Sequence, residues 1–169
     1  VVDVAAGKVM NINGTGSGAG DYALASGATV NFTGGTQALN SGADITGPGS
    51  VSVSGGTVNI NTGATYSGVN TTAISSGALN FNAATTLDTV NLNLSGGTLG
   101  GTGAVNVTGA MTWSGGTQSG SGTTTVVPTA SFTLSGSQSL ITRSFDNQSA
   151  TGQWTGNGTL TLDSATFIN

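Results

Sequence analysis

The side chains that most often carry protein chemistry are scarce in this chain. Its 169 residues include no His, no Cys, two basic residues and six acidic residues, and all six are aspartates. Without His or Cys there is no imidazole general base, no disulfide and no usual zinc ligand. What remains to consider is carboxylate pairs, Gly-rich calcium turns and rows of uncharged polar side chains.

Carboxylates about 5–10 Å apart could cleave a glycosidic bond. The repeat described below predicts that Asp44 and Asp146 share an outward position five coils apart, with Asp88 two coils from Asp44 and two positions later. No two aspartates from different coils are expected on adjacent rungs. Arg143, near Asp146, is expected to form an exposed ion pair. We therefore predict no catalytic residue and no enzyme activity.

A calcium site is the second possibility. Segment 16–21 (GSGAGD) is similar to one turn of a calcium-binding β-roll. Such a motif needs its Gly-rich Asp turn on successive coils, and the following coils do not repeat it. We predict neither a metal nor a cofactor.

The overall composition narrows the class of partner. Charged residues make up 5% of the chain, against roughly 25% in average soluble domains. Two cations cannot neutralise a row of phosphates, so we predict no nucleic-acid binding. No stretch approaches the roughly 20 continuous apolar residues of a membrane span. The 36% of hydrophobic residues argues against disorder, because disordered chains combine low hydrophobicity with high charge.

A repeat of about 20 residues organises the chain. An apolar–x–apolar triplet followed by Ser/Thr-Gly-Gly-Thr occurs in full at 30–36, 51–57, 92–98 and 111–117, and looser copies occur between them. The copies begin at positions 10, 30, 51, 72, 92, 111, 132 and 152. Short alternating runs with Gly-rich breaks predict strands. A steady period favours stacked coils over an antiparallel sandwich. We therefore predict an all-β parallel β-solenoid, one domain over 1–169, with about eight coils and three short strands per coil.

The repeat also predicts which side chains point inward. One inward column is Ile12, Phe32, Val53, Ile74, Leu94, Trp113, Leu134 and Trp154. A second column, on the third strand of each coil, is Ala25, Ile45, Tyr66, Leu87, Val107, Val126, Asn147 and Phe167. Both tryptophans are therefore expected in the core, where burial of each large side chain contributes about 1.5–3 kcal/mol.

The residues between the inward positions predict outward polar rows. The first is a polar ladder of Asn11, Asn31, Ser52, Asn93, Thr112 and Thr133, with Ala73 and Gln153 in the same row. The third strand is expected to present Asp44, Thr65, Thr86, Asn106, Thr125, Asp146 and Thr166. Rows of Thr can bind ice where they are flat and regular, but Asn106 and Asp146 interrupt this one.

The two ends are the other candidate surface. Neither end has an amphipathic helix or a charge cluster of the kind that caps a solenoid. Val2 and Val4 begin a strand with no rung below, and Phe167 and Ile168 end one with no rung above. We interpret these four residues as self-association edges. Either the chain is an excerpt of a longer solenoid, or its ends pair with further copies as a head-to-tail fibre.

Several stretches resemble the repeats of bacterial secreted and surface β-helix proteins of the adhesin and autotransporter-passenger type. They are 94–109, 110–122 and 144–158. The resemblance covers most of the chain and implies a right-handed parallel β-helix at the cell surface or outside the cell. It implies adhesion or scaffolding and assigns no catalytic residue.

These observations give one functional hypothesis and two alternatives. The first is a non-enzymatic structural or adhesive solenoid, a stalk, adhesin segment or fibre subunit, with itself or surface glycans as partner. The first alternative is a carbohydrate-binding or carbohydrate-active β-helix, and the second is an ice-binding solenoid.

Overall fold

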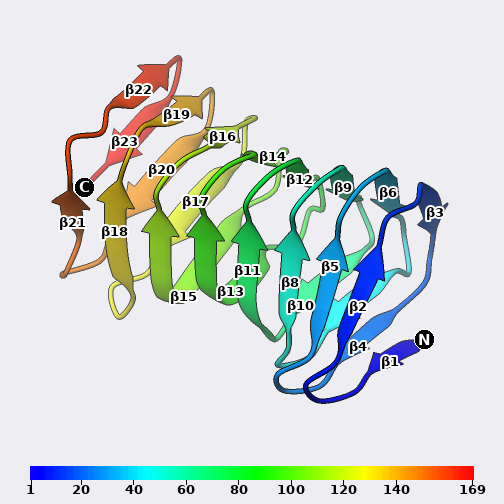
Figure 1. Ribbon diagram of the computed structural model, residues 1–169. Coiled ribbons are helices and arrows are strands. Elements are labelled where there is room, and N and C mark those ends of the chain that lie inside the picture. Colours follow the sequence, from blue (N-terminus) through cyan, green and yellow to red (C-terminus); the bar gives the residue numbers. More distant parts are fainter.

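The structure, a computed structural model, describes residues 1–169 and contains β-strands but no helix. The chain winds into about eight stacked coils of about 21 residues, so each strand pairs in parallel with the equivalent strand of the next coil. Figure 1 shows the coils advancing along one axis, with the two termini at opposite ends of the stack. The predicted all-β parallel solenoid is confirmed.

Three faces make up each coil. The first face carries strands whose apolar residues alternate with outward Asn, Ser and Thr. They are β2 (Val9–Ile12), β5 (Thr29–Phe32), β8 (Ser50–Val53), β11 (Val69–Ile74), the later parts of β13 (Leu87–Leu94) and β15 (Val105–Trp113), β18 (Ser131–Ser135) and β21 (Gln153–Thr155).

The second face follows the Gly-rich corner after each of these strands. Its strands are β3 (Gly16–Gly18), β6 (Thr36–Leu39), β9 (Thr57–Ile60), β12 (Ala78–Phe81), β14 (Thr98–Gly100), β16 (Thr117–Ser119), β19 (Gln138–Ile141) and β22 (Leu160–Asp163).

The third face closes the coil and leads to the next one. Its strands are β1 (Val2–Val4), β4 (Tyr22–Leu24), β7 (Asp44–Thr46), β10 (Thr65–Ser67), the earlier parts of β13 and β15, β17 (Thr123–Val126), β20 (Ser144–Asn147) and β23 (Thr166–Ile168). The hydrogen-bonded ladder of this face is interrupted once, between β10 and β13.

The Gly-Gly corners place two demands on the backbone. The second glycine of each pair has a positive φ, as at Gly97 (66°) and Gly116 (77°), a conformation that glycine adopts without steric cost. A Cβ at Gly97 would lie 2.6 Å from the carbonyl oxygen of Gly77, and one at Gly116 equally close to that of Gly97. Glycine is therefore required both by the turn and by the corner of the coil below.

The core contains 33 buried hydrophobic residues. The first predicted inward column is in register from Ile12 through Phe32 and on to Leu134 and Trp154. Its last member differs from the prediction. Trp154 pairs with Leu134 but remains 57% exposed, because it lies on the last rung and no coil covers it.

The second predicted column is correct in register only in parts: Ile45 pairs with Tyr66, and Val107, Val126 and Asn147 share one column. On the third face Leu87 pairs with Val105 rather than with Val107, and Phe167 pairs with Phe145 rather than with Asn147. At the other end the prediction named Ala25, yet its neighbour Leu24 is the buried residue, paired with Val4. The coils differ in length at this face, so a fixed spacing drifts by one or two residues.

A buried polar chain lies where the ladder of the third face is interrupted. The Tyr66 hydroxyl is 2.6 Å from Thr72 Oγ1, which donates to Thr89 Oγ1 at 3.0 Å. All three residues are buried. Burial raises the pKa of the Tyr66 hydroxyl far above its usual range, and the hydrogen bond to Thr72 offsets part of that rise.

Candidate functional site

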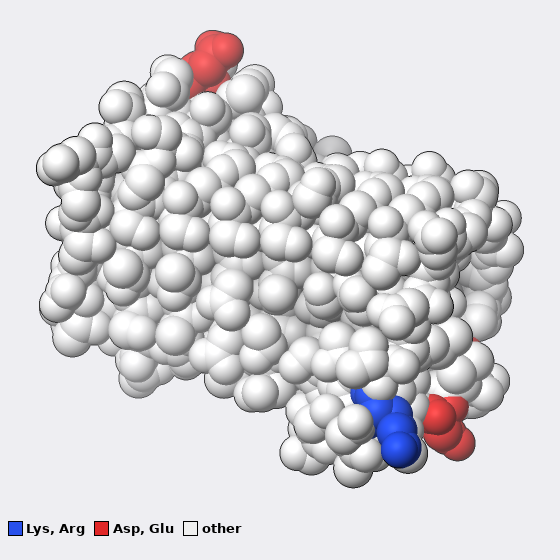
Figure 2. Space-filling view, viewed as in Figure 1, with Lys and Arg blue, Asp and Glu red and all other residues white.

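The strands of the first face contain no charged residue. Figure 2 shows one side of the molecule, on which the coloured atoms are confined to the regions near its two ends. A partner of the first face would therefore meet uncharged hydroxyl and amide groups, whereas the third face carries Asp44, Asp88 and Asp146.

The structure places the predicted polar ladder in one outward row of the first face. Asn11 pairs with Asn31, which pairs with Ser52, and the row continues to Gln153 at the last rung. Asn31 Nδ2 donates to Asn11 Oδ1 at 3.1 Å, and Ser54 Oγ donates to Asn31 Oδ1 at 3.0 Å. These hydrogen bonds connect side chains of neighbouring coils, so some polar groups of the ladder stabilise the stack. The remaining members are Asn93, Thr112 and Thr133.

A second polar row, on the second face, was missed from the sequence. It consists of hydroxyl residues with one alanine, each paired with the next: Thr36, Thr57, Ala78, Thr98, Thr117, Ser139 and Thr161. The signal was present, because four of these residues are the final Thr of the Gly-Gly-Thr phrase. The phrase marks a corner, and its Thr is also the first residue of the strand on the second face.

The predicted outward row of the third face is only partly in register. Thr65 pairs with Asp44, and Asn106, Thr125 and Asp146 share one row, as predicted. Asp88, rather than Thr86, pairs with Asn106, and Ile168, rather than Thr166, pairs with Asp146. Thr86 and Thr166 therefore lie outside the Thr row that ice binding would need.

The aspartates are also arranged differently from the prediction. Asp88 and Asp146 share one outward row, separated by the rungs of Asn106 and Thr125, which is about 14 Å at 4.8 Å per rung. No strand pairing connects Asp44 with that row, because the ladder is interrupted between β10 and β13. Because Tyr22 pairs with Ile45, Asp21 and Asp44 precede a matched pair on neighbouring strands. No group of three or more His, Cys, Asp or Glu side chains comes together.

The predicted exposed ion pair between Arg143 and Asp146 is wrong. Arg143 is fully buried, and its guanidinium makes five hydrogen bonds inside the solenoid. Nε donates to Thr124 Oγ1 at 2.9 Å, and the two Nη atoms donate to backbone carbonyl oxygens. These carbonyls belong to Gly101, Gly103, Ser119 and Thr123, at 3.2 to 3.3 Å.

Arg143 turns inward because its rung neighbours at that corner are small. The amide of Ser144 donates to the Gly122 carbonyl, so Arg143 lies directly over Gly122. A Cβ at Gly122 would lie 2.8 Å from Arg143 Nη1. The side chain therefore passes along the axis over a glycine to reach the carbonyls of Gly101 and Gly103, two coils below. Burial lowers the pKa of Arg143 to about 10, so the guanidinium remains charged at neutral pH.

The end rungs concentrate the exposed apolar side chains. Seven large hydrophobic residues are exposed, and six of them lie at the two ends of the stack. Those at the first rung are Val1, Val2 and Val9, and those at the last rung are Trp154, Leu162 and Ile168. The seventh, Val90, lies on the side of the stack. Each end also presents open sheet edges, since β1, β2 and β3 begin the three ladders and β21, β22 and β23 end them.

The four predicted edge residues divide into two kinds. Val2 and Ile168 are 43% and 52% exposed. Val4 is buried against Leu24, and Phe167 is half-buried and stacked on Phe145, with ring centroids 5.1 Å apart. Of the four, only Val2 and Ile168 are therefore exposed.

A hollow of about 200 Å³ opens at the last rung. Its apolar walls are Phe132, Leu134, Trp154 and Phe167, and Gly152 forms part of its floor. Gly152 follows the column of Met111 and Phe132 in register, so the missing side chain of this glycine creates the hollow.

Comparison of the chain with protein-family models, with curated proteins and with solved structures finds no significant match in any of the three. Among the elements of the fold there is no helix with the length and hydropathy needed to cross a membrane.

Proposed function

We propose that this chain is a structural rod of the cell exterior, extended at its ends by further parallel rungs and without enzymatic activity. The observation that carries this proposal is that six of the seven exposed large hydrophobic residues lie on the first and last rungs, beside six open strand edges. Exposed apolar patches mark interaction surfaces, and open edges pair with added strands. The resemblance to bacterial surface β-helix proteins supports the location, with surface glycans as a further partner of the uncharged first face.

The test is end-to-end association of the purified chain. We expect rods longer than one molecule by electron microscopy and a concentration-dependent increase in sedimentation coefficient. Val9→Lys and Trp154→Lys each place a charge on one end and should reduce the mean rod length sharply. Val90→Lys is the control, because Val90 is also an exposed apolar residue but lies on the side of the stack.

Mixing the two end variants sharpens the test. Each keeps one intact end, so an equimolar mixture should form dimers and nothing longer, since one competent junction joins the two chains. Discrete monomers of the unmodified chain at all accessible concentrations would overturn the proposal.

A further inference from the structure

The second face is the most regular of the three faces. Its strands form one uninterrupted ladder from β3 to β22. The ladder of the third face is interrupted between β10 and β13, and β13 and β15, which span the third and first faces, shift register between Thr89 and Asn91. Equivalent residues of the second face therefore repeat from rung to rung, about 4.8 Å apart, without a break.

The polar row of this face, which we call the hydroxyl row, presents nearly the same group on seven successive rungs. Five of its seven members are Thr, one is Ser139, and Ala78 is the single member without a hydroxyl. All seven are exposed or half-buried. Because a β-branched side chain has few χ1 rotamers, the row is a pre-ordered array of hydroxyl and methyl groups.

The hydroxyl groups of this row are not used inside the protein. Elsewhere in the stack, polar rows bond to themselves: Asn31 donates to Asn11 on the first face, and Asn80 donates to Asn59 beside the hydroxyl row. None of the hydroxyls from Thr36 to Thr161 in the hydroxyl row is hydrogen-bonded to another protein atom. Their donors and acceptors are therefore directed to molecules outside the stack.

The surroundings of the row are uncharged and short. Strands β6, β9, β12, β14, β16 and β19 contain no Asp, Lys or Arg. A second outward row runs beside the hydroxyl row, two residues further along each strand. Its members are Ala38, Asn59, Asn80, Gly100, Ser119 and Ile141. A partner can therefore contact this face without removing a charge from water, which is a costly step.

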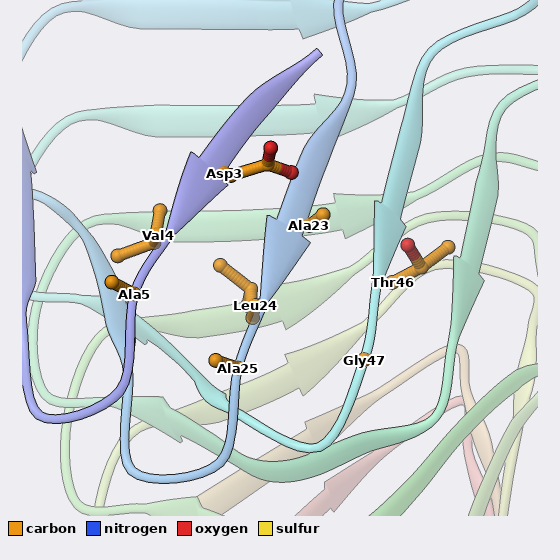
Figure 3. A pocket seen from close by; sticks show the side chains of 8 residues that line it. All are labelled: Asp3, Val4, Ala5, Ala23, Leu24, Ala25, Thr46 and Gly47. Atoms are coloured by element: carbon orange, nitrogen blue, oxygen red, sulfur yellow. The ribbon is translucent and has the colours of Figure 1, made fainter.

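The third face does not share these properties. Figure 3 shows Asp3, Ala23 and Thr46 on neighbouring strands, where they follow one another in an outward row. A hollow of about 390 Å³ opens beside them. A carboxylate, a methyl and a hydroxyl group beside a hollow do not form a flat, repeating array.

We propose that the hydroxyl row of the second face is an ice-binding surface. The rung spacing of about 4.8 Å is close to the repeat of oxygen atoms along one axis of hexagonal ice, so successive Thr side chains can hold water molecules at lattice positions. The outward positions of β6 to β19 on this face include no aromatic ring on which a sugar could stack, which favours ice over a crystalline polysaccharide.

The effect of the purified chain on ice tests this proposal. We expect the unmodified chain to shape growing ice crystals and to lower their freezing temperature below their melting temperature, which is thermal hysteresis. Thr98→Lys with Thr117→Lys changes two paired members in the middle of the row and should abolish both effects. The matched control is Thr112→Lys with Thr133→Lys, two paired threonines of the first face, and it should retain both. Circular dichroism checks that the variants are folded.

A gain of activity is the sharper measurement, because a misfolded variant cannot produce it. Ala78→Thr supplies the missing hydroxyl of the row, so we expect larger thermal hysteresis than in the unmodified chain. Ala73→Thr makes the same change in the polar ladder of the first face, on the same coil, and should leave the hysteresis unchanged.

Four outcomes would overturn the ice-binding surface. They are a folded unmodified chain with no effect on ice, equal losses in the two pairs of Lys variants, equal gains from the two Thr variants, and binding to insoluble cellulose or chitin without any effect on ice. End-to-end association is measured separately and involves other residues, so each proposal can fail without the other.

Discussion

At the scale of single residues, Arg143 is unusual because it is the one charged side chain buried in this core. A cation inside a core is normally compensated by a carboxylate. Here four backbone carbonyls and one hydroxyl surround the guanidinium, and Thr124 passes the network on by donating to Gln118 Oε1 at 2.7 Å. The carbonyls come from the two coils below that of Arg143, so the side chain fastens three successive coils to one another.

Replacing Arg143 should therefore be costly. Arg143→Met keeps much of the side-chain volume but leaves buried carbonyls unpaired, each worth about 1–3 kcal/mol. We expect the free energy of unfolding to fall by about 3 kcal/mol or more, measured by urea denaturation. Lys8→Met, at an exposed corner, is the control and should change it by less than about 0.5 kcal/mol. A loss at Arg143 no larger than the control would contradict the role assigned to this residue.

Tyr66 gives a pH-dependent prediction. In the unfolded chain its hydroxyl ionises near pH 10, whereas burial keeps it neutral in the folded chain well above that pH. The folded state is therefore favoured fully below pH 10 and loses stability as the pH rises further. The difference in unfolding free energy between the unmodified chain and Tyr66→Phe should shrink by about 1.4 kcal/mol per pH unit above pH 10.

Urea unfolding of both chains at pH 8, 10 and 11 measures this difference. Arg143, whose pKa is lowered to about 10, shifts stability in the opposite direction as the pH rises, but it does so in both chains and cancels. A difference that stays constant from pH 8 to pH 11 would show that Tyr66 is not shielded from solvent.

At the scale of elements, the Gly corners and the short strands depend on each other. A strand of three or four residues pairs with the next rung only if the corner before it brings the backbones into contact. The glycine at such a corner therefore stabilises the fold in two ways. It adopts a positive φ, and it allows the backbone of the coil below to approach closely. The two contributions can be measured separately.

Gly77 and Gly27 form a matched pair for this purpose. Both have positive φ, 70° and 75°, but a Cβ at Gly77 would overlap the backbone of Gly55 and Gly56, whereas at Gly27 the nearest atom is 3.7 Å away. Gly27→Ala should cost about 1–2 kcal/mol, the penalty of the left-handed conformation alone. Gly77→Ala should cost at least twice as much. Equal losses in thermal or urea unfolding would mean that the coils can separate at the corner without penalty.

The strand register of the third face could not be predicted from an average repeat length. Each strand of the first face directly precedes the Gly-rich corner phrase, which fixes its position in the coil, and the rows of this face were predicted residue by residue. The third face has no such phrase. Leu87 and Val105 pair across a shorter coil than Phe145 and Phe167 do, so an average period cannot locate the partners of Asp88 or Thr166.

At the scale of the whole molecule, the scarcity of charge affects how the rods associate. The proposed junction consists of apolar side chains and backbone hydrogen bonds, with no ion pair. Raising NaCl from about 0.05 M to about 1 M, where the Debye length falls to about 3 Å, should change the association constant by less than about twofold. Sedimentation velocity measures it.

Sulfate provides the complementary measurement. Because it strengthens the burial of apolar surface, it should promote association at the same ionic strength. A junction weakened severalfold by NaCl would instead depend on charge and would be inconsistent with the apolar ends.

The sequence by itself determined the architecture of this protein and one of its polar rows. A corner phrase recurring about every 20 residues can be satisfied only by stacking equivalent backbone, and alternation then assigns the sides of the first face. Only the tertiary structure showed the features that depend on unequal coil lengths, or on a side chain that extends along the axis into neighbouring coils. Arg143 is buried because a glycine lies below it, and Leu87 pairs with Val105 because the coil between them is short. Each of these features depends on which residues of neighbouring coils lie above one another, and the sequence pattern within a single coil does not specify that.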